Sequence, residues 1–381
     1  MLARVSRTRR SDDSRVKQQM RRSALAAVVV LAAACSASGG TAGPPSGAPT
    51  AGPTAVSSAS ATVGATDLPA PTTSGLPTSI PSGPPARAGA IAYVLGPEGA
   101  SEVHVMAPDG TGDRTCGTGS EPSWSADGST IVFAGPLSPI TGDPLVAFPD
   151  VYRAAADCTG VARVIKEGTA PHLSPDGARI TFGRGIIDTG DVWIAKADGS
   201  EPRRLMAGTA PTWSPNGSWL LLNPGGGAIE LGLVRPDGTG YHALAIGYDP
   251  SWTPDGRIVY LRSDYPKATA TLRIIALDGT ATDLFTVPGE LGSPRMLADG
   301  RVIFVWNRDV WRLDPGSKEP LRLTQGIMIV AGPSASADGR WAAVAVGGSN
   351  PGLVVLSIDG GWVRLRTGVV SAVAWQPVSS P

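Results

Sequence analysis

The sequence has few of the residues that metal sites and covalent active sites most often use. It contains three histidines and three cysteines in 381 residues. It has no His-Glu-x-x-His pair, no Gly-x-Ser-x-Gly motif and no Gly-x-x-x-x-Gly-Lys loop. His104, His172 and His242 fall in different segments, so they are not expected to share a metal ion. These absences predict a protein that is not an enzyme and needs no cofactor.

The chain also lacks a net charge and, after residue 90, any amphipathic helical pattern. Lys and Arg number 32, as do Asp and Glu. Residues 1–22 hold eight of the basic residues and two of the acidic ones, which leaves 24 basic against 30 acidic residues in the remainder. An acidic body lacks the basic patches that bind phosphate backbones. The composition therefore excludes nucleic acid as an expected partner.

The N-terminal region resembles a bacterial lipoprotein signal. Arg21 and Arg22 precede the apolar stretch SALAAVVVLAAA, which is too short to span a bilayer as a stable helix and leads to Cys35. The segment LAAAC resembles a lipobox. This resemblance implies that residues 1–34 are a removed extension and signal peptide, and that a lipid on Cys35 anchors the protein to the outside of the cell membrane. An ordinary secretory signal with an incidental cysteine is the alternative.

Residues 35–88 are almost wholly Ala, Gly, Pro, Ser and Thr. Such a segment buries too little apolar surface to offset the entropy of ordering it, so we expect a disordered tether. Beyond it lie two further cysteines, Cys116 and Cys158. Outside the cytoplasm such a pair can oxidise to one disulfide, and two buried free thiols are the alternative.

One short motif recurs along the rest of the chain. It consists of a hydrophobic residue, Ser, Thr or Leu, a small residue or Pro, and then Asp-Gly or Asn-Gly, as in PTWSPNG at 211–217. Six copies place their Asp or Asn at positions 127, 176, 216, 255, 299 and 338, with separations of 49, 40, 39, 44 and 39 residues. A period near 40 indicates a repeat architecture. One carboxylate per turn is too few for calcium, so these side chains are expected to bond within their own turns, although a calcium ion in a central channel stays open.

Each repeat contains four short segments rich in Val, Ile, Leu, Trp and Tyr, which predicts four strands. A second turn recurs seven times, at Asp109 and its equivalents, against six copies of the first. The N-terminus therefore supplies three strands without a first, and residues 371–377 supply a first strand without the rest. Joining them hides both end edges of a ring. We predict an all-β fold, a seven-bladed β-propeller over residues 89–377 closed by the C-terminal strand, with six blades as the alternative.

The repeated motif resembles the WSPDG repeats of TolB-like propellers, a WD-repeat-like class, and of the dipeptidyl-peptidase propellers. The resemblance covers about residues 89–377 and specifies the architecture, while a fold of this kind hosts many functions. It implies a role as a docking module in the bacterial cell envelope. Trp124, Trp213, Trp252 and Trp375 recur at one position of the first strand and are expected to pack between blades.

The two faces of such a ring differ. The short Asp-Gly and Asn-Gly turns share one face, here called the turn face, and the remaining connections share the other, the loop face. The long insertion at 135–150 falls on the loop face, as does the segment 262–271. Because binding residues concentrate on variable loops, we predict a partner site there that includes Phe148, Asp150, Tyr265 and Lys267. The alternative is that these loops only decorate the rim.

The sequence thus predicts a lipid-anchored, monomeric propeller outside the cytoplasm that binds an envelope protein or peptide without catalysis. Two alternatives remain. One is a propeller enzyme of the lactonase, lyase or hydrolase type with a metal in the channel. The other is a ligand-sensing or solute-binding lipoprotein.

Overall fold

The apolar segments between the turns form antiparallel strands, because successive side chains point to opposite faces of a blade and both faces are buried against neighbouring blades. The computed structural model describes residues 88–97, 99–140, 143–185, 190–225, 229–264 and 266–377. Cys35, the predicted signal peptide and nearly all of the predicted tether lie outside the described residues. Within these ranges no helix has the length and apolarity that crossing a membrane requires.

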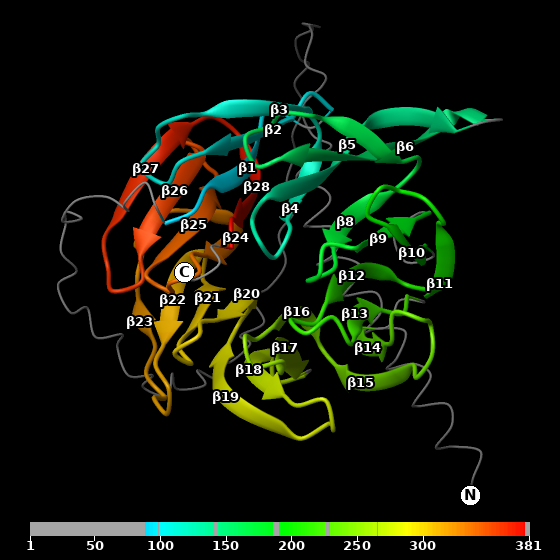
Figure 1. The fold of residues 1–381 in the computed structure, drawn as a ribbon. Coiled ribbons are helices and arrows are strands. Elements are labelled where there is room, and N and C mark those ends of the chain that lie inside the picture. The colour runs from blue at the N-terminus through cyan, green and yellow to red at the C-terminus, as the bar shows by residue number, and fades with distance from the viewer. Residues whose placement is uncertain are drawn as a thin grey trace, which may run out of the picture. The chain divides into compact units, whose positions relative to one another are not determined.

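The strands form seven four-stranded antiparallel blades arranged as a ring (Figure 1). Blade 1 contains β28 (Val370–Trp375), β1 (Ile91–Leu95), β2 (Glu102–Met106) and β3 (Arg114–Thr118). Blade 2 contains β4 (Ser120–Trp124), β5 (Thr130–Ile140), β6 (Asp143–Ala155) and β7 (Ala162–Ile165). Blade 3 contains β8 (Thr169–Leu173), β9 (Arg179–Arg184), β10 (Asp191–Lys196) and β11 (Arg203–Ala207).

The remaining four blades follow the chain in the same order. Blade 4 contains β12 (Thr209–Trp213), β13 (Leu220–Asn223), β14 (Glu230–Val234) and β15 (His242–Ile246). Blade 5 contains β16 (Tyr248–Trp252), β17 (Ile258–Asp264), β18 (Thr269–Ile275) and β19 (Ala281–Pro288). Blade 6 contains β20 (Leu291–Met296), β21 (Val302–Trp306), β22 (Asp309–Leu313) and β23 (Leu321–Arg322). Blade 7 contains β24 (Ile329–Ala335), β25 (Trp341–Val346), β26 (Gly352–Ser357) and β27 (Trp362–Thr367).

The predicted closure of the ring is confirmed. The C-terminal strand β28 pairs antiparallel with the N-terminal strand β1, from Ile91 opposite Trp375 to Leu95 opposite Val370. Blade 1 is therefore assembled from both ends of the described chain, and the count is seven rather than the alternative six. Both strands that would otherwise be open edges are paired.

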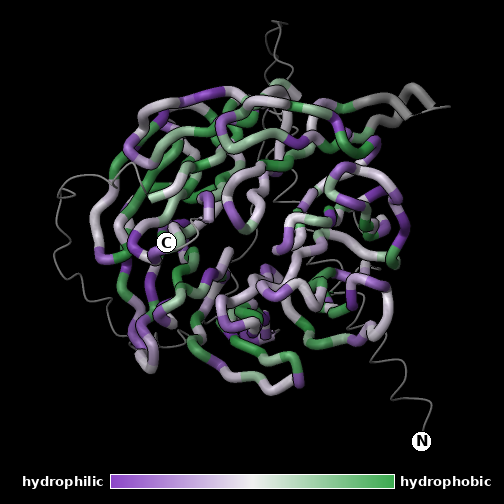
Figure 2. The backbone as a smooth tube through the Cα atoms, in the orientation of Figure 1, coloured by the Kyte–Doolittle hydropathy of each residue, from purple (hydrophilic) through white to green (hydrophobic). Residues whose placement is uncertain are grey.

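The hydrophobic core lies between blades rather than within one. Seven clusters of buried apolar side chains in the described residues each combine two neighbouring blades. Figure 2 shows hydrophobic segments along the strands and hydrophilic ones at many of the turns. Each blade has an apolar surface on both faces and is stable only when both are covered, which a closed ring achieves for every blade.

The repeated tryptophans join successive blades, as predicted. The indole N–H groups of Trp124, Trp213 and Trp252 each donate a hydrogen bond to a backbone carbonyl in the innermost strand of the preceding blade. The acceptors are Ala374 at 3.1 Å, His172 at 3.2 Å and Thr212 at 3.3 Å. An indole fits this position because its apolar surface fills the space between diverging blades, while its N–H bonds to a backbone carbonyl.

The aspartates of the repeated motif form hydrogen bonds within their own turns, which confirms that part of the prediction. In blade 2, Asp127 Oδ1 accepts hydrogen bonds from Ser125 Oγ at 2.6 Å and from Ser129 N at 3.0 Å. The bonds from these two serines hold the pKa of the Asp127 carboxyl below its usual range. Asn216 takes the same place in blade 4 and accepts from Ser214 Oγ at 2.8 Å. The motif therefore makes a turn, and a carboxylate or an amide serves equally.

Candidate functional site

The insertion on the loop face is a β-hairpin arm. Strands β5 and β6 contain 11 and 13 residues, whereas the other strands contain at most eight. After a register shift between Ala134 and Leu137, pairing continues through Leu137 opposite Pro149 and Ser138 opposite Phe148. The arm extends beyond the rim of the ring (Figure 1). A two-stranded arm has two free edges, so prolines, which cannot donate ladder hydrogen bonds, are tolerated in it.

Asp150 lies at the base of this arm and is 1% exposed. Its Oδ2 accepts a hydrogen bond from Arg163 Nη1 at 3.0 Å, and its Oδ1 accepts one from Glu167 N at 2.9 Å. The carboxylate thus ties β6 to the connection between β7 and β8. The structure places this predicted contact residue inside the blade, where it supports the arm instead of facing a partner.

A spacing in the sequence explains the place of Asp150. In three blades an acid of the third strand forms an ion pair with an arginine 13 residues later. These pairs are Asp150 with Arg163, Asp191 with Arg204, and Asp309 with Arg322. Asp309 is 3% exposed and also accepts a hydrogen bond from Thr324 Oγ1 at 2.9 Å. Asp150 is therefore one copy of a structural repeat, and the recurring 13-residue spacing is the signal that identifies it.

Large exposed apolar side chains of the described residues lie at both faces, and the four most exposed of them lie at the loop face. Leu137 on the arm is 65% exposed, and Phe148, on the paired strand, is half-buried. Ile246, Val330 and Val369 are 55, 51 and 52% exposed, and each lies at or beside a connection between a fourth and a first strand. Large exposed apolar side chains near one face are typical of a contact surface.

The other predicted contact residues lie in blade 5. Lys267 is exposed at the tip of the β17–β18 hairpin, and its Nζ lies 3.3 Å from Asp264 Oδ2. Tyr265 lies outside the described residues. Blades 2 and 5 are separated by two other blades, so the structure does not bring Phe148 and Lys267 together (Figure 1). A partner that touched both would have to cover the loop face across the ring.

The three histidines lie at different radii. His172 is in the innermost strand β8, His242 is in the outermost strand β15, and His104 is in β2. His104 Nδ1 lies 3.2 Å from Asp113 Oδ1, an ion-pair distance if the ring is protonated. Within the described ranges, no three His, Cys, Asp or Glu side chains are grouped so that they could hold a metal ion.

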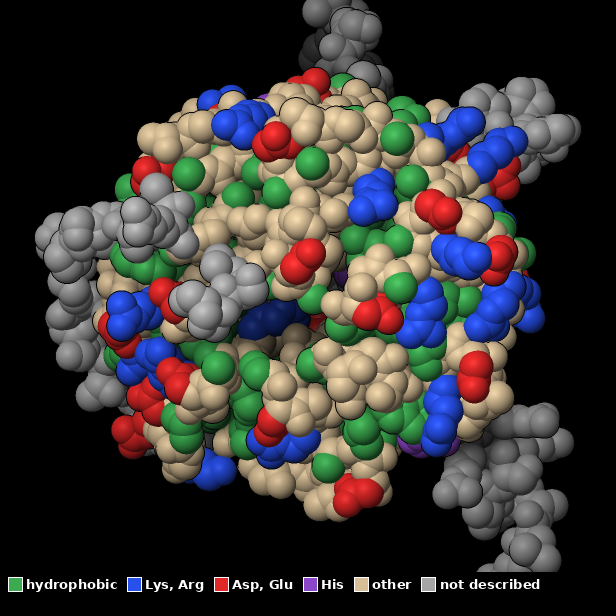
Figure 3. All heavy atoms as spheres, viewed as in Figure 1, with side chains coloured by type: hydrophobic (Ala, Val, Ile, Leu, Met, Phe, Trp, Pro, Cys, Tyr) green, Lys and Arg blue, Asp and Glu red, His purple; other side chains and the backbone are tan. Residues whose placement is uncertain are grey.

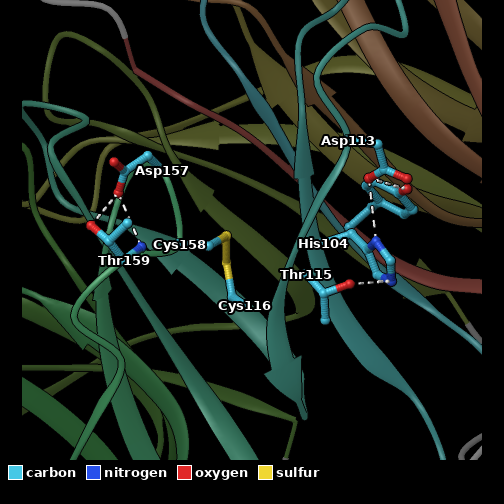
Figure 4. The surroundings of a disulfide bond; sticks show 8 residues. His104, Asp113, Thr115, Cys116, Asp157, Cys158 and Thr159 are labelled. Atoms are coloured by element: carbon cyan, nitrogen blue, oxygen red, sulfur yellow. Dashed lines mark hydrogen bonds and ion pairs between the residues drawn. A yellow bond between two sulfur atoms is a disulfide. The ribbon is translucent and has the colours of Figure 1, made fainter.

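Cys116 and Cys158 are joined by a disulfide (Figure 4). Cys116 belongs to β3 in blade 1, and Cys158 lies in the turn between β6 and β7 of blade 2. The neighbouring Asp157 accepts hydrogen bonds from Thr159 N at 3.0 Å and from Thr159 Oγ1 at 2.6 Å, which shapes this turn. The bond therefore links the blade that closes the ring to the next one.

Comparison with known proteins identifies the fold. The sequence matches no protein-family model, and no curated protein is similar to it in sequence. Among solved structures, TolB from Acinetobacter baumannii is 17% identical, with a TM-score of 0.50 over 77% of this chain and 68% of that one. The fold is that of a TolB-like β-propeller.

Enzymes also have structures similar to this TolB-like propeller. The dihydro-heme d1 dehydrogenase NirN is 15% identical, with a TM-score of 0.52 over 81% of this chain and 79% of that one. The acylaminoacyl peptidase of Pyrococcus horikoshii is 13% identical, with a TM-score of 0.52 over 72% of this chain and 52% of that one. This chain thus spans about half the length of the peptidase.

These similarities overturn the prediction that the protein is not an enzyme. A dehydrogenase and a peptidase share the propeller fold, so neither the fold nor the scarcity of histidine excludes catalysis. A propeller can acquire chemistry from a few side chains in its channel or from an attached domain, neither of which alters the repeat pattern. Identities of 13 to 17% show the fold alone, so no activity is transferred to this chain.

Proposed function

We propose that this protein is an extracytoplasmic propeller that binds a protein or peptide of the bacterial cell envelope through its loop face. The observation that carries the proposal is the difference between the two faces. The turn face repeats one short turn, whereas the loop face bears the β5–β6 arm with the exposed Leu137 and the half-buried Phe148. The resemblance to TolB-like propellers supports the same role.

The disulfide and the N-terminal signal support a location outside the cytoplasm. Disulfides persist in oxidising compartments, and Cys116 and Cys158 are bonded. We further propose that Cys35 carries a lipid and that residues 35–88 connect this anchor to the ring and hold it away from the membrane. The protein is proposed to be a monomer.

Metabolic labelling with a fatty-acid probe tests the anchor. The wild-type protein should carry the label, and Cys35→Ser should lose it, because the thiol that accepts the lipid is removed. Cys116→Ser serves as a control for the loss of any cysteine and should stay labelled. Equal labelling of the wild-type protein and Cys35→Ser would remove the lipid anchor from the proposal.

Crosslinking and pull-down from cell envelopes test the loop face. Leu137→Ser removes the most exposed apolar side chain among those described on the arm and should weaken capture of the partner by about tenfold. Val161→Ser is a matched control, because Val161 is 42% exposed in the same blade but follows the turn between β6 and β7 on the turn face. The proposal predicts one partner that the wild-type protein and Val161→Ser retain and Leu137→Ser loses. Equal capture by both variants would contradict it.

A further inference from the structure

The central channel contains a cavity of ≈ 430 Å³ at its turn-face end. Its lining comes from the innermost strands of five blades, and it includes Ala337 in a first-to-second turn and Pro377 just after β28. The space-filling view shows a hollow at the centre of the ring with a basic side chain in its depth (Figure 3). A cavity of this volume is in the range of small-ligand sites.

Arg295 in β20 is the basic residue that lines this cavity. Its Nη1 donates to the carbonyl of Pro294 at 2.9 Å, and it forms no ion pair with a described residue. Burial lowers the pKa of its guanidinium, while the charge of Asp249 acts in the opposite direction. The guanidinium of Arg295 is half-buried, with the charge of Asp249 in its surroundings but no direct ion pair, whereas most buried charges are paired.

The acids of the innermost strands nearby are already engaged with the backbone. Glu121 Oε2 accepts a hydrogen bond from Ala170 N at 2.7 Å, and Asp249 Oδ2 accepts one from Ser293 N at 3.1 Å. In both cases the carboxylate binds the innermost strand of the next blade. They hold neighbouring blades together, and neither forms a direct ion pair with Arg295.

A neutral pair of side chains lines the same cavity. Ser123 Oγ and His172 Nδ1, from β4 and β8, lie 2.9 Å apart. Burial lowers the pKa of His172 to about 4, so the imidazole is neutral at pH 7. If the serine hydroxyl donates to Nδ1, the histidine keeps an N–H at Nε2; if Nδ1–H donates, the serine keeps its O–H. Either tautomer leaves one donor for a ligand.

The rest of the lining is largely apolar, from Trp124, Val373 and Trp375 among others. The cavity thus combines a guanidinium without a direct ion pair, the donor of the Ser123–His172 pair, the hydroxyl of Ser334, whose Oγ accepts a hydrogen bond from Trp375 N at 2.9 Å, and otherwise apolar walls. A planar carboxylate can accept two parallel hydrogen bonds from a guanidinium. A phosphate dianion would need more positive charge than one arginine with Asp249 in its neighbourhood supplies.

We propose that the turn-face end of the channel is a binding site for the carboxylate of a monoanionic ligand, held by Arg295 with a hydrogen bond from the Ser123–His172 pair. The ligand is a small organic acid or the C-terminus of a polypeptide. The site lies at the opposite end of the channel from the loop face and does not depend on the function proposed for that face.

Calorimetric titration of the full chain tests this site with two matched pairs of probes. One pair is benzoate and benzamide, and the other is acetylated trialanine with a free or an amidated C-terminus. Each carboxylate should bind, and each amide should bind roughly ten- to a hundredfold more weakly, because hydrogen bonds to charged groups are the stronger ones. Tighter binding of benzoate identifies a small acid as the ligand class, and tighter binding of the peptide identifies a chain terminus. Equal binding of acid and amide, tighter binding of inorganic phosphate, or no binding of either carboxylate would overturn the proposal.

Variants at Arg295 separate a binding role from a structural one. Arg295→Gln should lose carboxylate binding, and Arg295→Lys, which keeps the charge without the planar fork, should retain part of it. Without ligand, Arg295→Gln should melt close to the wild-type temperature, because Arg295 is half-buried and forms no direct ion pair that the substitution would break. Arg262→Gln, at an exposed position of β17, is the control and should change neither binding nor melting. A lower melting temperature for Arg295→Gln with wild-type binding of the carboxylates would show that Arg295 is only structural.

Discussion

A chain that ends before Val370 is expected to fail to form the ring. β28 covers β1 along its whole length, and Trp375 at its end is 5% exposed. Truncating one buried tryptophan costs about 3–5 kcal/mol, and the pairing of a whole strand is lost in addition. A protein of this kind is stable by about 5–15 kcal/mol, so the loss is comparable with the whole stability.

The side chain of Gln376 also stabilises the closure of the ring through two hydrogen bonds. Its Oε1 accepts a hydrogen bond from Ala90 N at 2.7 Å, and its Nε2 donates to the carbonyl of Gly128 at 2.6 Å. One side chain therefore joins the C-terminal strand to the start of blade 1 and to the first turn of blade 2. Loss of these bonds adds to the effect of the truncation.

Thermal unfolding followed by near-ultraviolet circular dichroism measures this effect. The truncated chain should show no cooperative transition, whereas Ser371→Ala, at an exposed position of the same strand, should melt as the wild-type protein does. A truncated chain with the wild-type melting temperature would contradict the closure by β28.

The second large effect is expected from the disulfide. Replacing Cys116 and Cys158 by serine opens a loop defined by a sequence separation of 42 residues. The entropy that such a loop removes from the unfolded chain corresponds to about 4 kcal/mol at 25 °C. The double variant should therefore be destabilised by about this amount, because its unfolded state gains conformational freedom.

Urea unfolding with and without dithiothreitol measures the effect of the disulfide. The reductant should destabilise the wild-type protein and leave the double variant unchanged, which makes the variant its own control. A wild-type protein whose unfolding midpoint does not move after complete reduction of this bond would contradict the prediction.

The ring could be predicted from the sequence because its determinants are local and repeated. The turn at Asn216 and its sister copies needs only neighbouring residues, so the period near 40 residues is visible without any structure. Because second turns outnumber first turns by one, the sequence predicts that residues 371–377 complete blade 1. The disulfide was one of two open interpretations, since sequence does not show that β3 and the turn at Cys158 lie side by side.

The site could be predicted less well, because neighbouring strands and ring geometry decide which side chains face outward. The insertion at 135–150 lies on the loop face, as the sequence predicts. It forms paired strands and not an irregular loop, because its two halves pair with each other. Its place in that insertion predicts Asp150 as a contact residue. The structure buries it because the facing strand supplies Arg163. Tyr265 and Lys267 remain predictions of a contact surface.

The sequence by itself determined the repeat, the turn chemistry and the closure by the C-terminal strand, because these depend on residues close together in the chain or on a period. Only the tertiary structure decided which side chains share the channel. Ser123 and His172 are 49 residues apart, and Arg295 lies more than a hundred residues further on. They line one cavity because closing seven blades around an axis brings the innermost strands together, and no local pattern in the sequence records that convergence.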